Sequence, residues 1–476
     1  MTAFVPSSQV QKIRRSIRHP VVDADGHILE FLPVMREIAE ELSDRRTADA
    51  MMTLLSDRTA RVRSTDRSNR RSAGMWRGSW WGVPAANTVD RATTTLPRLL
   101  YNRLDELGID FQFLYPTLGL LVFLVRDREL RRLMARSFNT YYASVFEGVR
   151  DRLEPAAVIP MHTPQEAVEE MRFAVSALGL RTVVMSGVIP RPLPGGGLEG
   201  AIWLDTIGHG GDHDYDPVWR ECERLRVVPT FHGTGMGWGS RTSPDNYVYN
   251  HLGSFSAACE ACCRSIIMGG AASRFPNLSW MFLEGGVTWA AQLQADLIEH
   301  FEKRNHVAVS QYDPRRIDWT LMNSLFAEYA TGRLTKSEQP SDVWVPYLSD
   351  PGDGDPTQDD FADSGVTSPE QFLERFRSFY FGCEPDDRLC AVAFDERLNP
   401  RGSRLNAVFS SDIGHWDVQD AREVLSEVWS LREESLLSEE DFRRLMFGNV
   451  VESFTRMDPG FFDGTAIAAA VSDSIS

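Results

Sequence analysis

Short apolar and β-branched runs alternate with amphipathic stretches along most of the chain. Between many of the runs, apolar residues recur every three or four positions, which predicts helices. Since parallel strands need crossover helices and eight strands close a barrel, the alternation predicts a (β/α)8 TIM barrel of the α/β class. The predicted strands are Pro20 to Asp25, Phe111 to Tyr115, Ala156 to Pro160, Thr182 to Ser186, Val227 to His232, Leu278 to Glu284, Phe379 to Glu384 and Ala407 to Asp412. The predicted helices include Glu129 to Arg150, Pro164 to Leu178, Pro217 to Arg224, Phe255 to Met268 and Trp289 to Arg304.

Two long stretches interrupt this alternation. They are residues 31–105, after the first strand, and 307–366, after the sixth. We interpret both as insertions into one domain that spans residues 1–476, and we expect the first to be a lid. Residues 431–476 are expected to form a C-terminal helical extension.

Charge and composition exclude several classes of function. The net charge of −17 repels nucleic-acid phosphates and anionic membranes, so neither partner is expected. The N-terminus lacks the apolar core of a signal peptide and no stretch is long enough to span a bilayer, which favours a cytoplasmic protein. The basic stretch from Arg58 to Arg71 is interpreted as solvated, with contact to an anionic part of a substrate as the alternative.

Three of the six cysteines, Cys259, Cys262 and Cys263, lie within one predicted helix. Their spacing would suit a metal or redox site, but no second pair at zinc-finger spacing completes one. We therefore interpret them as small residues of a buried helix face.

Reactive polar residues stand at the carboxyl ends of the predicted strands, which is the face on which TIM-barrel active sites form. Asp25 and His27 are two positions apart, so both side chains leave the same face of an extended strand. His232 ends the fifth strand, Glu284 the sixth and Asp412 the eighth. Because a carboxylate that ends a buried strand needs a cation or strong hydrogen bonds, these five residues are predicted metal ligands.

Other polar residues near these strand ends have two interpretations each. Glu30 and His251 are predicted as further ligands, although His251 could instead cap a helix. His415 is expected to hydrogen-bond a ligand carboxylate, and we predict catalytic roles for His251, Glu284 and His415. The structural alternative for Glu284 is a salt bridge to an arginine. A cluster on the fourth strand's loop is interpreted as solvated; it comprises His209, Asp212, His213 and Asp214.

Several segments resemble the amidohydrolase-related TIM barrels, a family that includes the aminocarboxymuconate-semialdehyde decarboxylases. The resemblance rests on Asp25-Gly-His27 and on the stretches 269–289 and 411–417. It implies a divalent metal centre at the barrel mouth. The chain departs from the family at Glu284, where the decarboxylases and hydrolases carry a catalytic histidine, and at Ser186, where binuclear hydrolases often have lysine or glutamate nearby.

The carboxylate-rich ligand set resembles the branch of this family that contains the nonheme diiron monooxygenase of platensimycin and platencin biosynthesis. That resemblance implies two Fe ions, dioxygen as co-substrate, an external electron donor and hydroxylation of a hydrophobic, terpenoid-like CoA thioester. The alternative is a Zn or Mn hydrolase or decarboxylase, and a third hypothesis is a catalytically silent binding barrel. The sequence leaves open a homo-oligomer.

Tryptophans near the predicted site are candidates for substrate contact. A Trp-rich loop in the first insertion would cover a bulky apolar substrate, or would serve as the local core of the insertion. The predicted substrate-binding residues are Trp76, Trp80, Trp81 and Trp238.

Overall fold

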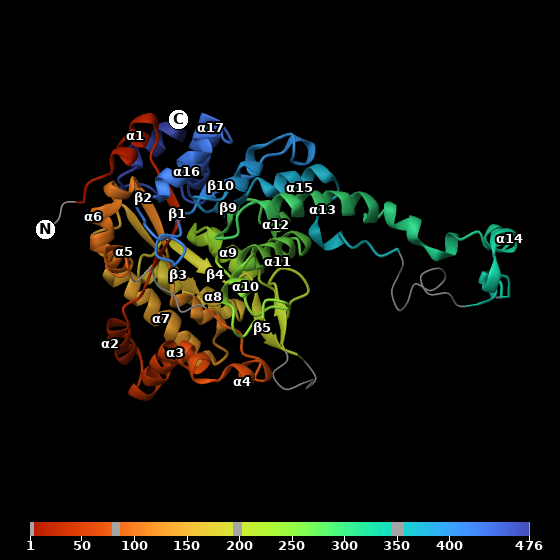
Figure 1. Cartoon of the computed structure of the whole chain (residues 1–476), viewed down its shortest axis with the longest axis horizontal. Helices are drawn as coiled ribbons and strands as arrows, with labels where there is room; N and C mark the ends of the chain where they lie inside the picture. Colours follow the sequence, from red (N-terminus) through yellow and green to blue (C-terminus); the bar gives the residue numbers. More distant parts are fainter. Residues whose placement is uncertain (1–3, 79–85, 194–201, 337, 344–356, 476) are drawn as a thin grey trace.

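The protein is a barrel of eight parallel strands surrounded by helices, which confirms the predicted TIM-barrel fold (Figure 1). The computed structural model describes residues 4–78, 86–193, 202–336, 338–343 and 357–475. Neighbouring strands are joined in the order β1-β2-β3-β4-β7-β8-β9-β10, and each overlaps one predicted strand. The strands are β1 (Val22–Ile28), β2 (Phe111–Pro116), β3 (Leu153–Ile159), β4 (Thr182–Met185), β7 (Pro229–Phe231), β8 (Trp280–Phe282), β9 (Phe379–Cys383) and β10 (Asn406–Phe409).

Backbone hydrogen bonds join the first strand to the segment that follows the last. The amide of Asp412 donates to the carbonyl of Asp25 at 2.9 Å, and the amide of His27 donates to the carbonyl of Ile413 at 2.7 Å. Three predicted metal ligands are therefore held by the bonds that close the barrel.

Helices cover the outside of the barrel, and the five predicted ones are present with small shifts at their ends. The second of these runs through α8 and continues as a π-helix, η2 (Arg172–Ala177). The helices of this layer are α6 (Pro97–Leu107), α7 (Arg128–Val145), α8 (Pro164–Met171), α9 (Asp216–Leu225), α11 (Ser254–Met268), α12 (Ala271–Arg274), α13 (Thr288–Arg304), α15 (Pro369–Phe376) and α16 (Val424–Glu433). None of the described helices is both long and apolar enough to span a bilayer.

A short antiparallel hairpin of β5 (Ile189–Pro192) and β6 (Ile202–Asp205) follows β4, and the sequence did not predict it. Pro190 and Pro192 lack the amide hydrogen of a regular strand, so the segment does not have a typical strand pattern. The loop beyond it exposes His209, Asp212, His213 and Asp214, as expected of a solvated cluster.

The first insertion packs on α7 and lies beside the loop after β7. Arg67 Nε is 2.7 Å from Asp245 Oδ2, and the Arg77 amide donates to the Ser243 carbonyl at 3.0 Å. Its helices, other than α6, are α2 (Leu32–Leu42), α3 (Arg45–Ser64), α4 (Arg67–Ser72) and α5 (Thr88–Thr93). This position beside a loop at the catalytic face is the one that a lid requires.

The second insertion extends away from the barrel (Figure 1). Its main helix, α14 (Trp319–Tyr329), has no buried residue and lies at the far end of the molecule in this view. Short 3-10 turns occupy much of the rest: η3 (Ala308–Tyr312), η4 (Pro314–Arg316), η5 (Gly332–Lys336), η6 (Pro340–Asp342) and η7 (Ala362–Ser364).

The C-terminal extension packs against the end of the barrel at which the strands begin. The ring of Phe454 stacks on that of Phe113 with centroids 4.3 Å apart, and Asn449 Nδ2 donates to the Ala407 carbonyl at 2.7 Å. Its elements are α17 (Glu439–Arg443), η10 (Arg444–Gly448), α18 (Asn449–Met457) and α19 (Ala468–Ile475). The extension therefore closes the end of the barrel opposite the predicted ligands.

Candidate metal centre

The five predicted strand-end ligands form one buried cluster. His27 Nε2 is 3.5 Å from Asp25 Oδ1 and 3.2 Å from Asp412 Oδ1. His232 Nε2 is 2.7 Å from Glu284 Oε2 and 3.9 Å from Asp25 Oδ2. The barrel thus brings together residues that are hundreds of positions apart in the chain.

His415 completes the cluster from the loop after β10. Its Nδ1 is 2.7 Å from Asp412 Oδ1, and its ring stacks on that of His27 with centroids 3.7 Å apart. Candidate ligand atoms lie within 4.8 Å of one another in two overlapping groups, Asp25 with His27 and His232, and His27 with Glu284, Asp412 and His415. His415 is therefore placed either to bind a metal itself or to hydrogen-bond the carboxylate of Asp412, as the sequence suggested.

The backbone is strained at two of the carboxylates. Glu284 has a φ of 60° and Asp412 a φ of 52°, values that residues other than glycine rarely adopt. Gly414, with a φ of 118°, passes so close to His27 that an added Cβ would lie 2.7 Å from the His27 carbonyl oxygen. Strain of this kind persists only where surrounding structure enforces it, and it clusters at functional sites.

Asp23 has a structural role beside the cluster. It accepts hydrogen bonds from the Ser411 amide at 2.8 Å, from Ser411 Oγ at 2.5 Å and from Gln112 Nε2 at 2.7 Å. These bonds tie β1 to the end of β10, so Asp23 positions Asp25 and Asp412 without joining them.

Burial makes the carboxyl groups of the cluster hard to ionise in the absence of a cation. It raises the pKa of Asp25 and of Glu284 well above the usual value, and the neighbouring Asp412 raises both further. Burial also raises the pKa of Asp412, to about 7. For His27 the pKa is lowered well below its usual value, first by burial and then by His415. The imidazole is therefore neutral, which is the form that binds a metal.

These residues fit a divalent cation. Among the described residues, neither carboxylate oxygen of Asp25 has a hydrogen-bond partner, and His27 Nε2 faces carboxylate oxygens of Asp412 and Asp25 at 3.2 and 3.5 Å. Within the described parts of the chain, the ion pairs of Asp25, Glu284 and Asp412 are with histidines and not with arginine or lysine. Buried carboxylates without a fixed positive charge require a cation, and mixed oxygen and imidazole donors suit Zn²⁺, Mn²⁺ or Fe²⁺.

The structure does not bring Glu30 into the cluster. Its carboxylate accepts hydrogen bonds from the amides of Leu118 at 2.8 Å and Gly119 at 3.0 Å, and from Tyr142 Oη at 2.5 Å. These bonds occupy both oxygens and direct them to the segment after β2. Glu30 therefore satisfies its charge locally, where the sequence suggested a metal ligand.

His251, in α10 (Tyr247–His251), lies in a layer outside the cluster and belongs to neither group of candidate ligands. Its ring contacts those of Tyr247, Phe255 and Trp416, with centroids 5.2, 5.4 and 5.8 Å away. Burial lowers its pKa, against the opposing effect of Asp417. This geometry separates His251 from the position of a direct ligand.

Two partly buried acidic groups near the cluster were not predicted as site residues. Burial, with Asp412 as the next contribution, raises the pKa of Glu384 to about 10 and of Asp417 to about 8. Glu384 ends the seventh predicted strand, so the rule that selected Glu284 and Asp412 would also have selected it. Asp417 follows the last strand in the stretch 411–417, and its position in the sequence does not indicate that this loop turns toward the cluster.

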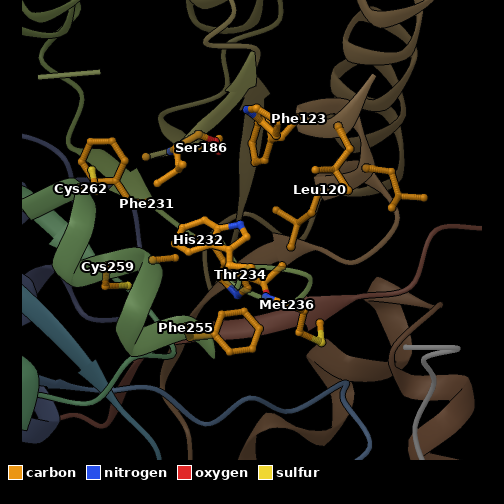
Figure 2. Close-up of a pocket in the computed structure, with 18 of the residues that line it drawn as sticks. Leu120, Phe123, Ser186, Phe231, His232, Thr234, Met236, Phe255, Cys259 and Cys262 are labelled. Atoms are coloured by element: carbon orange, nitrogen blue, oxygen red, sulfur yellow. Dashed lines mark hydrogen bonds between the residues drawn. The ribbon is translucent and has the colours of Figure 1, made fainter. Parts of the chain in front are cut away.

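An apolar cavity of about 270 Å³ opens onto the cluster. His232 and His415 are part of its wall, Trp238 also lines it, and Leu55 of α3 contributes from the first insertion. Figure 2 shows His232 between the side chains of α11 and those that follow β2. Cys259 and Cys262 lie on the α11 side, and all six cysteines are buried free thiols.

The other three tryptophans predicted to contact the substrate are not found in the cavity wall as described. Trp76 packs against Gly237 and is not among the described residues that line the cavity. Trp80 and Trp81 lie outside the described residues. The expectation of a Trp-rich cover therefore stays a prediction.

The fold and the cluster together define a TIM barrel with a metal-binding site at the carboxyl ends of its strands. The amidohydrolase family profile matches residues 22–335, more than half of the chain, so the protein belongs to the amidohydrolase family.

One relative and two solved structures are similar to this chain. A 2-amino-3-carboxymuconate-6-semialdehyde decarboxylase of Dictyostelium discoideum is 27% identical over 153 residues, which are 32% of this chain and 38% of that protein. An amidohydrolase structure from Mycobacterium avium subsp. paratuberculosis K-10 has a TM-score of 0.55 at 17% identity, and the match covers 92% of this chain and 100% of the other. A 5-carboxyvanillate decarboxylase from Sphingomonas paucimobilis matches with a TM-score of 0.49 at 13% identity, covering 92% and 99% of the two chains.

Proposed function

We propose that this protein is a metal-dependent hydrolase or decarboxylase that uses Zn²⁺ or Mn²⁺. The observation that carries the proposal is a buried cluster of imidazoles and carboxylates without a fixed cation, which opens directly onto a cavity. Family membership and the decarboxylase relative support it. Asp25, His27, His232, Glu284 and Asp412 would hold the ion, and a bound ion would supply polarisation of a carboxyl or acyl oxygen and a lowered pKa of water.

Asp412 and His415 are placed to handle protons in this reaction. Asp412 Oδ1 is 2.7 Å from His415 Nδ1, and His415 Nε2 is 3.4 Å from Thr117 Oγ1. Both His415 and Thr117 line the cavity, so a proton that Asp412 accepts can pass through the imidazole toward the substrate. Burial lowers the pKa of His415 to about 3, which keeps the ring neutral and able to accept that proton only transiently.

A nonheme diiron monooxygenase is the second candidate, although none of the comparisons supports it. The observation in its favour is that two further carboxyl groups, Glu384 and Asp417, are near the cluster. The charge of Asp412 raises the pKa of both groups. Carboxylate oxygens in this number suit two hard cations better than one. Dioxygen, an external electron donor and a CoA thioester belong to this second candidate.

Metal content is the first test of the site. We expect His27→Ala, His232→Ala and Asp412→Ala each to lose bound metal while the barrel stays folded, because strand ends at the catalytic face tolerate substitution better than the apolar interior of the barrel. His209→Ala, in the exposed loop after the hairpin, is the matched control and should keep its metal. Full metal content in all three site variants would refute the assignment.

Turnover without oxygen separates the two candidate functions. The metal-free protein would be reloaded under anaerobic conditions with Zn²⁺, Mn²⁺ or Fe²⁺, and metal-to-protein ratios measured. It would then be screened with organic acids for released CO₂ and with esters and amides for hydrolysis. The proposal predicts activity with Zn²⁺ or Mn²⁺ in the absence of oxygen. Two Fe per chain, with turnover only in the presence of oxygen and a reductant, would establish the monooxygenase instead.

A further inference from the structure

Apart from the two histidines, Trp238 and three residues with hydroxyl groups, the described side chains that line the cavity beside the cluster are hydrocarbon or sulfur. Leu120 and Phe123 belong to η1 (Gly119–Leu124), on one side of His232, and Met236 and Phe255 lie on the other (Figure 2). No Lys, Arg, Asp, Glu, Asn or Gln is among the described residues that line the cavity. Away from the two histidines and the Trp238 indole, a charged or amide group on a ligand would therefore find no matching side chain among these residues.

The hydroxyl groups in the wall already have partners within the protein. Thr117 Oγ1 is 3.4 Å from His415 Nε2. Ser186 Oγ donates to the Val188 carbonyl at 2.6 Å. Thr234 Oγ1 donates to Ser254 Oγ at 3.1 Å and accepts from the Met236 amide at 3.1 Å. These bonds leave the side-chain hydroxyls little capacity to bind a polar substituent of a ligand.

The position of the η1 wall is fixed by buried hydrogen bonds. Glu30 binds the amides of Leu118 and Gly119, at the start of the turn that carries Leu120 and Phe123. An added Cβ at Gly119 would lie 2.5 Å from Tyr142 Oη, so the turn is also packed tightly against α7. The wall is therefore poorly able to rearrange around a polar ligand.

We propose that the substrate has a hydrocarbon body without hydroxyl or second carboxyl groups, and one polar reacting group at the end next to His232. The position of the reacting group rests on the proposed function, whereas the nature of the body rests on the cavity wall alone. A hydroxyl on the body would leave water without gaining a partner, which weakens binding. A second carboxylate would meet no cation and would approach a cluster that is already rich in carboxyl groups.

Two rigid probes test this inference. Adamantane-1-carboxylate carries a compact hydrocarbon body and one carboxylate, and 3-hydroxyadamantane-1-carboxylate adds a single hydroxyl. Their dissociation constants would be measured by calorimetry with zinc-loaded and with metal-free protein. We expect the unsubstituted acid to bind the zinc-loaded protein about tenfold to a hundredfold more tightly, the range over which an apolar pocket rejects an added hydroxyl.

Variants of the wall show whether the body occupies this cavity. Met236→Gln and Leu120→Asn place an amide in the wall, and at least one of them should reduce the ratio of the two dissociation constants toward one. Met236→Leu keeps the wall apolar and should keep the ratio. Metal content provides the folding control for each variant. A ratio that stays unchanged in both Met236→Gln and Leu120→Asn would overturn the inference, because the body would then bind elsewhere.

The two hypotheses fail in different ways. Equal affinity of the wild-type protein for the two probes overturns the inference about the body, while zinc-dependent binding of both acids would still support the proposed function. Conversely, a preserved preference for the unsubstituted acid that is independent of zinc supports the apolar body and contradicts a metal-bound carboxylate.

Discussion

At the scale of single residues, the cluster combines electrostatic and conformational strain. Glu284 and Asp412 are buried carboxylates with positive φ, and each lies two or three residues after the end of a barrel strand. Neither feature stabilises the metal-free protein, since left-handed backbone costs about 1–2 kcal/mol for a residue with a Cβ. Cation binding offsets the electrostatic part, which explains how such a site is maintained.

The backbone strain at Glu284 can be measured with a pair of substitutions. Glu284→Gly should be more stable than Glu284→Ala by about 1 kcal/mol in the metal-free protein, because glycine adopts a φ of 60° without penalty. The same pair at Glu384, which is not among the residues of positive φ, should give the opposite order. Chemical denaturation in the presence of a chelator measures all four variants. Equal stability of the two Glu284 variants would contradict the strain.

The raised pKa values of the acidic groups predict how the stability of the metal-free protein depends on pH. Asp412 and Asp417 have pKa values of about 7 and about 8 in the folded state, against about 4 in the unfolded chain. The folded state therefore binds more protons, and its stability falls as the pH rises from about 4 to these values. The lowered pKa of His415, about 3, acts oppositely, but only below the pH of about 6.5 at which an unfolded histidine titrates.

Between pH 6.5 and 8, only the acidic groups of this set still bind different numbers of protons in the folded and unfolded states. We therefore expect the free energy of unfolding to fall across this range. The slope is at most about 1.4 kcal/mol per pH unit for each proton. Denaturation curves with a chelator measure it, and Asp417→Asn should make the slope shallower. Saturating Zn²⁺ should abolish the fall, since the bound ion keeps the carboxylates ionised. A metal-free protein that gains stability from pH 6.5 to 8 would contradict the electrostatic description.

Residue type and strand position were enough to predict which residues meet in the central cluster, because a buried parallel strand is an apolar run that ends where the catalytic face begins. Their role as ligands stays a prediction. The same information could not assign Glu30. Its spacing from Asp25 and His27 is compatible with a ligand, but its hydrogen bonds to Leu118, Gly119 and Tyr142 depend on how β2 and α7 pack. Sequence spacing does not contain that packing.

At the scale of secondary-structure elements, predictability followed the strength of the local pattern. Most of the eight barrel strands are short apolar runs, and the sequence predicts all eight. The β5–β6 hairpin was missed, since Pro190 and Pro192 obscure it and Arg191 is only partly buried. The arm that carries α14 was recognised as an insertion, but its apolar composition is that of a packed helix and gives no sign that it extends into solvent.

Glu30 connects two elements, β1 and η1, and its substitution tests that connection. Glu30→Gln should lower the free energy of unfolding by about 2–3 kcal/mol, because the amide nitrogen would face backbone donors and leave a buried group unpaired. Metal content should stay at the wild-type level, since Glu30 lies outside the cluster. Tyr142→Phe removes only one of the three bonds and should cost less. Loss of metal from a stably folded Glu30→Gln variant would restore the ligand hypothesis.

At the scale of the whole molecule, a compact barrel carries a protruding and unusually apolar arm. Leu321, Leu325 and Tyr329 on α14 are 54, 43 and 68% exposed, and they lie four residues apart on one helix face. Because proteins in water seldom leave a continuous apolar stripe exposed, we predict that the arm is a contact between copies. Homo-oligomer formation stays a prediction, as does the lid role of the first insertion.

The arm can be tested independently of the barrel. The double variant Leu321→Ser with Leu325→Ser should unfold with a free energy within about 0.5 kcal/mol of wild type, since no residue of α14 is buried. Leu431→Ala, on the buried face of α16, is the contrasting control and should cost about 2–5 kcal/mol. Light scattering over a range of concentrations would report association. We expect any self-association of the wild-type chain to weaken in the double variant, because its apolar stripe is lost. Destabilisation of the double variant by more than about 1 kcal/mol at low concentration would instead show that α14 packs against its own barrel in solution.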